Sequence, residues 1–152
     1  DIDADLTLLG SGAEEPKLKE LAQILGVAEQ ILYPGTVDNP EEYLNKTDVL
    51  VHASHYEAFG LVLLEAMACG KPVVCFNDGG PAEVAVNELN GLVVERGDVN
   101  VFANAVARLA NDKELYLKLS KQALEFSKQY GLQQYADKVF SLYEKLVSER
   151  KQ

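Results

Sequence analysis

The feature that most constrains the fold lies between residues 48 and 76, which read as a strand, a helix and a second strand with short links. The helix begins near Phe59–Gly60 and is apolar almost all round, so we expect it to be buried. Gly70 ends it, and Pro72 prevents it from restarting. The two flanking runs are apolar and rich in β-branched residues, which is typical of strands: Asp48-Val49-Leu50-Val51 and Val73-Val74-Cys75-Phe76.

Two carboxylates interrupt this apolar stretch of sequence: Glu57 lies just before the helix and Glu65 lies inside it. A buried carboxylate without a partner is costly, so an acid here should face a cleft or a ligand. A helix start presents free N–H groups and a partial positive charge, and Gly60 leaves it open for a phosphate. Glu65 lies roughly 7.5 Å further along the axis, at ~1.5 Å per residue. This layout favours an anionic, hydroxylated ligand such as a nucleotide sugar.

An ordered series of motifs then resembles the E-x7-E signature of retaining family-4 glycosyltransferases, which have the two-domain GT-B fold. Glu57 and Glu65 are the two acids, and the match extends over nearly the whole chain to about Tyr143. The stretches that carry it are Leu8-Leu9-Gly10-Ser11-Gly12, Leu32-Tyr33-Pro34-Gly35-Thr36-Val37, His55-Tyr56-Glu57-Ala58-Phe59-Gly60-Leu61, Leu64-Glu65-Ala66-Met67-Ala68-Cys69-Gly70-Lys71-Pro72-Val73-Val74, Gly79-Gly80-Pro81-Ala82-Glu83-Val84, and Asn90-Gly91-Leu92-Val93-Val94 with Gly97-Asp98.

The resemblance and the helix-start geometry together suggest roles for the site residues. Glu57 is expected to contact the transferred sugar or the diphosphate region, and Glu65 the ribose hydroxyls. Backbone N–H groups of Phe59, Gly60 and Leu61 are the expected diphosphate and sugar ligands, with the Phe59 ring itself a packing wedge. The loop around Pro34 and Gly35 corresponds to the family's base-binding loop, and Gly10 and Gly12 would lie near the ligand at a strand's carboxyl end. Gly79 and Gly80 either let their loop approach the donor or make a turn before Pro81.

The rest of the chain alternates strands and helices. This alternation predicts an α/β fold, a doubly wound, Rossmann-like parallel sheet with right-handed crossovers and C-terminal helices. We predict a single domain over residues 1–152. The expected strands are 5–9, 31–33, 48–51, 73–76 and 91–94. The expected helices start near Pro16, Pro40, Phe59, Pro81, Asp98 (as a cap, followed by apolar Val99, Phe102, Val106 and Leu109 at helical spacing), Lys113 and Leu132.

One part of the family pattern is missing. The resemblance implies a further strand and helix at the start of the nucleotide-binding domain, with a Gly-Arg…Lys-Gly pair that holds the pyrophosphate. Residues 1–12 do not match it. In the order 3-2-1-4-5-6 this strand would be the central one. The acceptor-binding domain is absent too, so we expect a fragment that supplies donor binding without catalysis.

Composition excludes several classes of function. The chain has 24 acidic and 14 basic residues, a formal net charge of −10, which argues against nucleic-acid partners and docking on anionic lipid. No apolar run approaches the ~20 residues of a membrane span. The two cysteines, Cys69 and Cys75, have no CxxC spacing and are interpreted as free thiols in a reducing, cytosolic compartment.

The predicted reaction moves a hexose from a nucleoside diphosphate sugar to a hydroxyl acceptor with retention. The resemblance implies front-face attack, with the leaving diphosphate stabilised by a helix N-terminus and cations and taking the acceptor's proton. The resemblance implies no metal or other cofactor, and the spacing of His52 and His55 suits neither a zinc helix nor a closed four-ligand site. Two alternatives stay open: a nucleotide-sugar epimerase using His55 beside Glu57, and a non-catalytic nucleotide-binding module.

Overall fold

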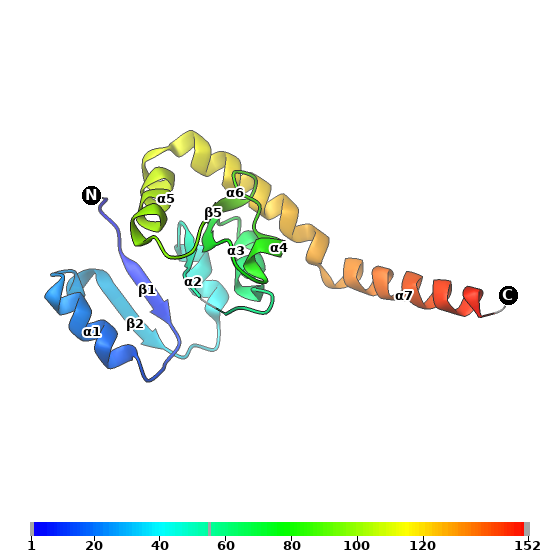
Figure 1. Ribbon diagram of the computed structural model, residues 1–152, viewed down its shortest axis with the longest axis horizontal. Helices are drawn as coiled ribbons and strands as arrows, with labels where there is room; N and C mark the ends of the chain where they lie inside the picture. Colours follow the sequence, from blue (N-terminus) through cyan, green and yellow to red (C-terminus); the bar gives the residue numbers. More distant parts are fainter. Residues whose placement is uncertain (1, 55, 151–152) are drawn as a thin grey trace. The chain divides into compact units, whose positions relative to one another are not determined.

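The computed structural model describes residues 2–54 and 56–150, and the chain divides into two compact units, Asp1–Tyr43 and Leu44–Gln152. We call them unit 1 and unit 2 and describe each by itself (Figure 1). The expected single domain stays a prediction.

Unit 1 is a two-stranded parallel sheet with one helix. Strand β1 (Leu6–Leu9) pairs with β2 (Ile31–Gly35), and α1 (Glu15–Ile24) and a short 3-10 helix η1 (Ala28–Gln30) connect them. Pro16 lies in the first turn of α1, where a proline costs no hydrogen bond. Helix α2 (Pro40–Lys46) follows and crosses the boundary between the units.

Unit 2 contains a three-stranded parallel sheet in the order β3-β4-β5. The central strand, β4, pairs with both neighbours and is buried along its whole length because it is apolar on both faces. The strands are β3 (Leu50–His52), β4 (Val73–Phe76) and β5 (Gly91–Val94), and the helices are α3 (Leu61–Ala68), α4 (Pro81–Val84), α5 (Val99–Asn111), α6 (Lys113–Ser127), η2 (Lys128–Tyr130, 3-10) and α7 (Leu132–Glu149).

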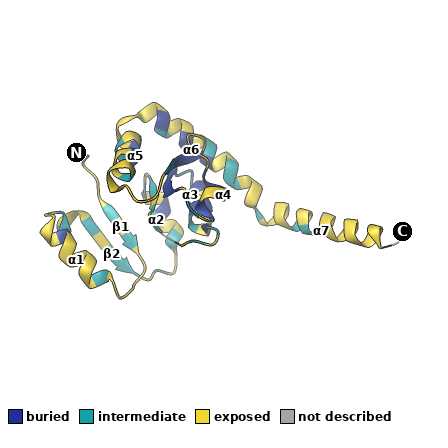
Figure 2. Cartoon of the chain, in the orientation of Figure 1, coloured by how far each residue is buried: buried dark blue, intermediate teal, exposed yellow. Residues whose placement is uncertain are grey.

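Alternate residues of β4 enter two hydrophobic cores, one on each face of this sheet. Helix α6 contributes to both cores, and Figure 2 shows the buried residues gathered around α3 and α6. The α3 core consists of Leu44, Leu63, Leu64, Ala66, Met67, Val73, Cys75, Val84, Ala85 and Ala123. The α5 core consists of Val74, Leu92, Ala105, Leu109, Leu115 and Leu119. The expected α/β class, with parallel strands covered on both faces, is therefore confirmed in unit 2.

Three details of the helices differ from expectation. Helix α3 is not buried on all sides, since Leu61 is 64% exposed, although Met67 is fully buried. Helix α5 is capped by Asp98 as predicted, but Val99 is 79% exposed because the first helical position points away from the core. The helix from Lys113, which we expect to run to about Gln129, ends at Ser127, and a 3-10 turn follows.

The thiols are free, as predicted. Cys75 lies in the α3 core and Cys69 packs against it, so the two share one cluster. Burial raises the pKa of the Cys75 thiol to about 11.

Helix α7 has no buried residue among those described (Figure 2). It nevertheless carries several large apolar residues that are exposed, among them Phe140 and Tyr143. Within the described part of the chain, every helix is too short or too polar to cross a bilayer.

Candidate functional site

The loops that follow β3, β4 and β5 are tied together at the carboxyl edge of the unit 2 sheet. Gly80 N–H donates to the Glu57 carbonyl at 3.0 Å, joining the first two loops. Asn77 N–H donates to the Val94 carbonyl, and its side-chain amide donates to Glu95 Oε1 at 2.9 Å, joining the second and third. In parallel α/β sheets ligands bind outside this edge, so the three loops form the candidate site.

Glu57 binds the backbone just before α3. Its Oε1 accepts hydrogen bonds from Phe59 N–H at 3.3 Å and Gly60 N–H at 3.1 Å. These bonds favour the ionised carboxylate and lower the pKa of Glu57, and the neighbouring His52 lowers it further. Two of the N–H groups expected to bind a diphosphate therefore hold Glu57 in this structure.

Glycines make the close contact between the first two loops possible. Gly60, the N-cap of α3, has φ +85°, a left-handed conformation that disfavours other residues. A Cβ on Gly80 would overlap the backbone of Phe59, and one on Gly79 would come within 2.8 Å of the Glu57 carbonyl oxygen. Gly79 and Gly80 thus have a packing role against the Glu57 loop, and their contact with a donor stays a prediction.

Glu65 lies on the exposed face of α3, one turn after Leu61. Residues four apart share a helix face, so Glu65 and the exposed Leu61 lie on the same side while Leu64 and Ala66 enter the core. Phe59 packs against the α3 core and lies 6.2 Å from the Tyr130 ring, which confirms its expected role as a packing wedge.

A hollow of about 420 Å³ lies beside Glu57 and is lined by Tyr56, Glu57, Ala58, Asp78 and Gly79. Arg96 borders it from the β5 loop. The guanidinium pairs with Asp78 at 3.0 Å and lies 5.8 Å from the centre of the Tyr56 ring. The Tyr56 side chain is otherwise open to solvent, with 90% of the residue exposed.

His52, the last residue of β3, shares a strand face with Leu50, which packs against the α3 core. Its Nε2 is buried, with no hydrogen-bond partner in the described part of the chain. Burial lowers the pKa of His52, and the Glu57 carboxylate opposes this shift. His55, on which the epimerase alternative depends, lies outside the described residues.

The remaining predicted site residues belong to unit 1, at the carboxyl end of its sheet. Pro34 and Gly35 are the last residues of β2, so the strand extends into the predicted base-binding loop. Gly10 and Gly12 follow β1, and Gly10 N–H donates to the Gly35 carbonyl at 2.8 Å. Ser11 and Thr36 hydroxyls lie 3.3 Å apart, which ties the same two loops. These residues lie together within unit 1, as expected of adjacent strand ends.

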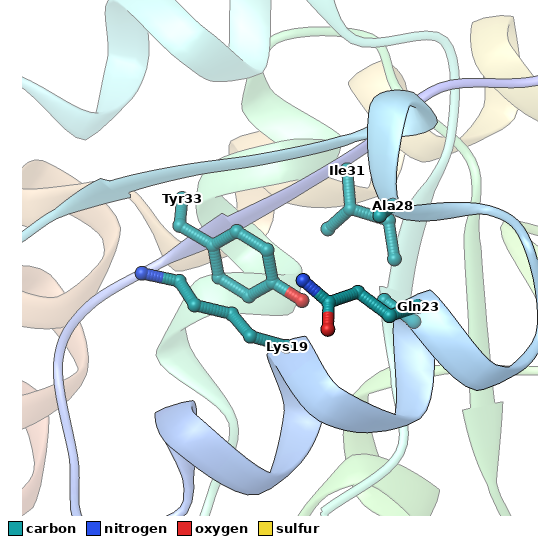
Figure 3. Close-up of a pocket in the computed structure, with 6 residues that line it drawn as sticks. Lys19, Gln23, Ala28, Ile31 and Tyr33 are labelled. Atoms are coloured by element: carbon teal, nitrogen blue, oxygen red, sulfur yellow. The ribbon is translucent and has the colours of Figure 1, made fainter.

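Unit 1 also has a smaller hollow of about 210 Å³ between α1, η1 and β2 (Figure 3). Lys19 Nζ lies 5.1 Å from the centre of the Tyr33 ring, and Figure 3 shows the Gln23 amide beside the Tyr33 hydroxyl. That hydroxyl is buried and has no hydrogen-bond partner among the described residues. No sequence pattern predicted this hollow, because Lys19 and Gln23 are ordinary residues of an amphipathic helix.

Among residues 2–54 and 56–150, no group of three or more His, Cys, Asp or Glu side chains is placed to hold a metal. The expected independence of metals and cofactors stays a prediction. Sequence reasoning missed Tyr56, Asp78 and Arg96 as neighbours, because they come from three separate loops. The only signal was that two of them adjoin motif residues, Tyr56 beside Glu57 and Asp78 beside Gly79.

The relatives and solved structures that resemble this chain are consistent with a single protein family. The chain is 37% identical over 125 residues to the N-acetyl-alpha-D-glucosaminyl L-malate synthase of Bacillus anthracis, covering 82% of this chain and 33% of that protein. Among solved structures, the sucrose-phosphate synthase of Thermosynechococcus elongatus matches with a TM-score of 0.84 and 32% identity, over 95% of this chain and 39% of that one.

A third match is Anabaena HepE, solved in complex with UDP-glucose, with a TM-score of 0.80 and 26% identity over 90% of this chain and 41% of that one. The chain spans less than half the length of the curated relatives it matches. The structural neighbours are GT-B glycosyltransferases. The family described as "Glycosyl transferases group 1" matches residues 1–126, and the chain belongs to this family.

Proposed function

We propose that this chain is the C-terminal, donor-binding domain of a retaining family-4 glycosyltransferase. In this proposal the whole protein transfers a hexose from a nucleoside diphosphate sugar to a hydroxyl acceptor, and the anomeric configuration is kept. The sugar-transferring relatives and the UDP-glucose complex of HepE support a nucleotide-sugar donor. We also propose a cytosolic location and a partner domain that binds the acceptor.

The observation that carries the proposal is the arrangement of two acids along α3. Glu57 lies at the helix start, and Glu65 lies on the exposed face one turn beyond Leu61. A diphosphate at the positive end of the helix would place a nucleoside alongside Glu65 and a sugar alongside Glu57. A carboxylate that accepts two ribose hydroxyls and one that faces the transferred sugar account for both acids.

The bonds of Glu57 imply a step in donor binding. Phe59 and Gly60 N–H groups now donate to its carboxylate, and a donor diphosphate needs the same groups. In the proposed complex the Glu57 side chain turns from its own helix toward the sugar as the diphosphate takes its place. The exchange replaces one anion with another at the helix start, so the positive end of α3 remains compensated.

In the proposed reaction no metal or other cofactor takes part. The leaving diphosphate is stabilised by the α3 N-terminus and by cations from another part of the full-length protein, and it accepts the acceptor's proton. Because those cations are not among the motifs of this chain, we propose that it binds donor and does not catalyse transfer alone.

A binding panel tests the proposal. The chain is titrated with UDP, GDP and ADP, with their glucose conjugates, and with FMN as a representative of other nucleotide modules, and binding is followed by thermal shift and calorimetry. We expect one nucleoside diphosphate series to bind and FMN not to bind. Binding of FMN alone would favour a nucleotide-binding module with no role in sugar transfer.

Two substitutions then separate the roles of the acids. Glu65→Ala should weaken binding of the plain nucleoside diphosphate by about 1.5–3 kcal/mol, the worth of hydrogen bonds to a charged group. Glu57→Ala should leave that affinity at least as high, because it frees the Phe59 and Gly60 N–H groups for the diphosphate, and it should abolish the preference for the sugar conjugate. Glu144→Ala, an exposed acid of α7, is the matched control. If Glu65→Ala binds the diphosphate like the unaltered chain, the ribose assignment fails.

A further inference from the structure

The hollow beside Glu57 is built from parts that the sequence scatters over three loops. Tyr56 comes from the loop after β3, Asp78 from the loop after β4, and Arg96 from the loop after β5. Hydrogen bonds already join these loops in pairs: Gly80 N–H to the Glu57 carbonyl, and the Asn77 amide to Glu95. The hollow is therefore held by the sheet edge itself and does not depend on one flexible segment.

Arg96 fixes the two side chains that face the hollow. Its guanidinium is 3.0 Å from Asp78 Oδ2 and lies over the Tyr56 ring, an arrangement in which a planar cation both pairs and stacks. Because a ring has two faces, a guanidinium over one of them leaves the other accessible, and Tyr56 is 90% exposed. The Asp78 carboxylate has a second oxygen, which keeps the capacity to accept hydrogen bonds.

This combination matches the chemistry of a pyranose ring. A sugar has an apolar face of C–H groups that packs on an aromatic ring and a rim of hydroxyls that donate to carboxylates. We propose that Tyr56 and Asp78, oriented by Arg96, form a subsite for a neutral sugar ring beside Glu57. The inference rests on the proposed function only in identifying where the sugar comes from.

The charges around the hollow favour a neutral sugar over a uronic acid. Glu57 and Asp78 both line it, Glu95 lies next to Arg96 in sequence, and Asp78 already neutralises the guanidinium. A sugar carboxylate would be repelled by these acids, and a chain with a formal net charge of −10 gives no compensating attraction. Selectivity by charge is therefore part of the inference.

The test uses free sugars, so that it does not depend on nucleotide binding. The isotope-labelled chain is titrated with glucose, galactose, mannose and N-acetylglucosamine, and separately with glucuronate and galacturonate, and amide shifts are followed by NMR. We expect at least one neutral sugar to shift Ala58, Asp78 and Gly79, and the uronates to bind at least tenfold more weakly. Absence of any shift there from all four neutral sugars would overturn the inference.

Variants show whether the ring and the ion pair are responsible. Tyr56→Ala should weaken sugar binding about three- to tenfold, and Tyr56→Phe should restore it because the ring face is kept. Tyr135→Ala, another exposed tyrosine, is the control. Arg96→Ala should also weaken binding of the neutral sugar, whereas Arg108→Ala, which breaks an exposed pair with Glu88, should not. Tight uronate binding that Arg96→Ala removes would instead make Arg96 an anion site and refute the proposal.

A competition arm identifies the source of the sugar. The best-bound of UDP-glucose, GDP-glucose and ADP-glucose is added to the chain saturated with the free sugar. Displacement of the free sugar assigns the subsite to the transferred sugar, and simultaneous binding assigns it to the acceptor. If none of the three conjugates binds, the proposed function fails, while the free-sugar titration still decides the subsite.

Discussion

The two units have similar strand–helix sequences but very different cores. In unit 2, β4 is fully buried and two clusters pack on opposite faces of its sheet. Among the described residues of unit 1, only Ala22 is buried, and Leu21, Ile24 and Leu32 are exposed. A two-stranded sheet covered by one helix has too few partners to bury its apolar side chains. The contrast shows that local sequence patterns are enough to form strands and helices. The extent of the hydrophobic core depends instead on how many layers of strands and helices pack together.

The largest expected difference between the units is in hydrogen exchange. Amides of β1 and β2 should exchange through openings of lower free energy than amides of β4, because few buried contacts oppose their opening. Native-state exchange followed by NMR, with the chain in increasing denaturant, measures both sets. Equal protection of β1 and β4 would show that unit 1 is stabilised as well as unit 2, contrary to the comparison.

Replacing a large apolar side chain by alanine should lower the free energy of unfolding much more in unit 2 than in unit 1. Met67→Ala removes a fully buried side chain from the α3 core and should cost about 2–5 kcal/mol. Leu21→Ala removes a half-exposed side chain of unit 1 and should cost less than about 0.5 kcal/mol, as for a surface substitution. Urea denaturation measures both. A loss under 0.5 kcal/mol for Met67→Ala would mean that α3 is not a core helix.

Replacing a buried polar residue tests how much its hydrogen bonds stabilise the loop before β5. The Asn90 side chain is fully buried, donates to the Val84 carbonyl at 3.0 Å and accepts from Val86 N–H at 2.8 Å. Asn90→Ala leaves both backbone groups without this partner, so it should cost about 1–3 kcal/mol in the same denaturation series. Asn111→Ala, which loses one exposed hydrogen bond to the Ala107 carbonyl, is the matched control. Equal losses would indicate that water replaces the Asn90 amide.

The smallest effect concerns the pH dependence of the Glu57 hydrogen bonds at the start of α3. Backbone hydrogen bonds hold the pKa of Glu57 below its ordinary value of 4.5. Stability from these hydrogen bonds is therefore present above that value and is lost as pH falls through the lowered pKa of the folded state. The carboxyl NMR shift of Glu57 should titrate below 4.5, and Glu57→Gln should reduce the acid dependence of α3 signals. A Glu57 pKa at or above 4.5 would contradict these hydrogen bonds.

Much of this architecture follows from particular residues. Gly70 and Pro72 require a break between α3 and β4, Asp98 begins α5, and the apolar runs predict β3, β4 and β5. The position of Glu65 along α3 also follows, because helical geometry fixes it once the helix start is known. Burial was predicted less well: Leu61 and Val99 are apolar yet exposed, because burial depends on which neighbouring elements cover a helix face.

By itself the sequence determined the family resemblance, the strand–helix order and the acids at α3, since these depend on residues close together in the chain. Only the tertiary structure decided that Gly80 must be small and that Tyr56, Asp78 and Arg96 meet. The physical reason is that parallel strands bring loops from distant positions to one edge of the sheet. Which side chains meet there depends on strand register and loop contacts, and no local pattern encodes either of them.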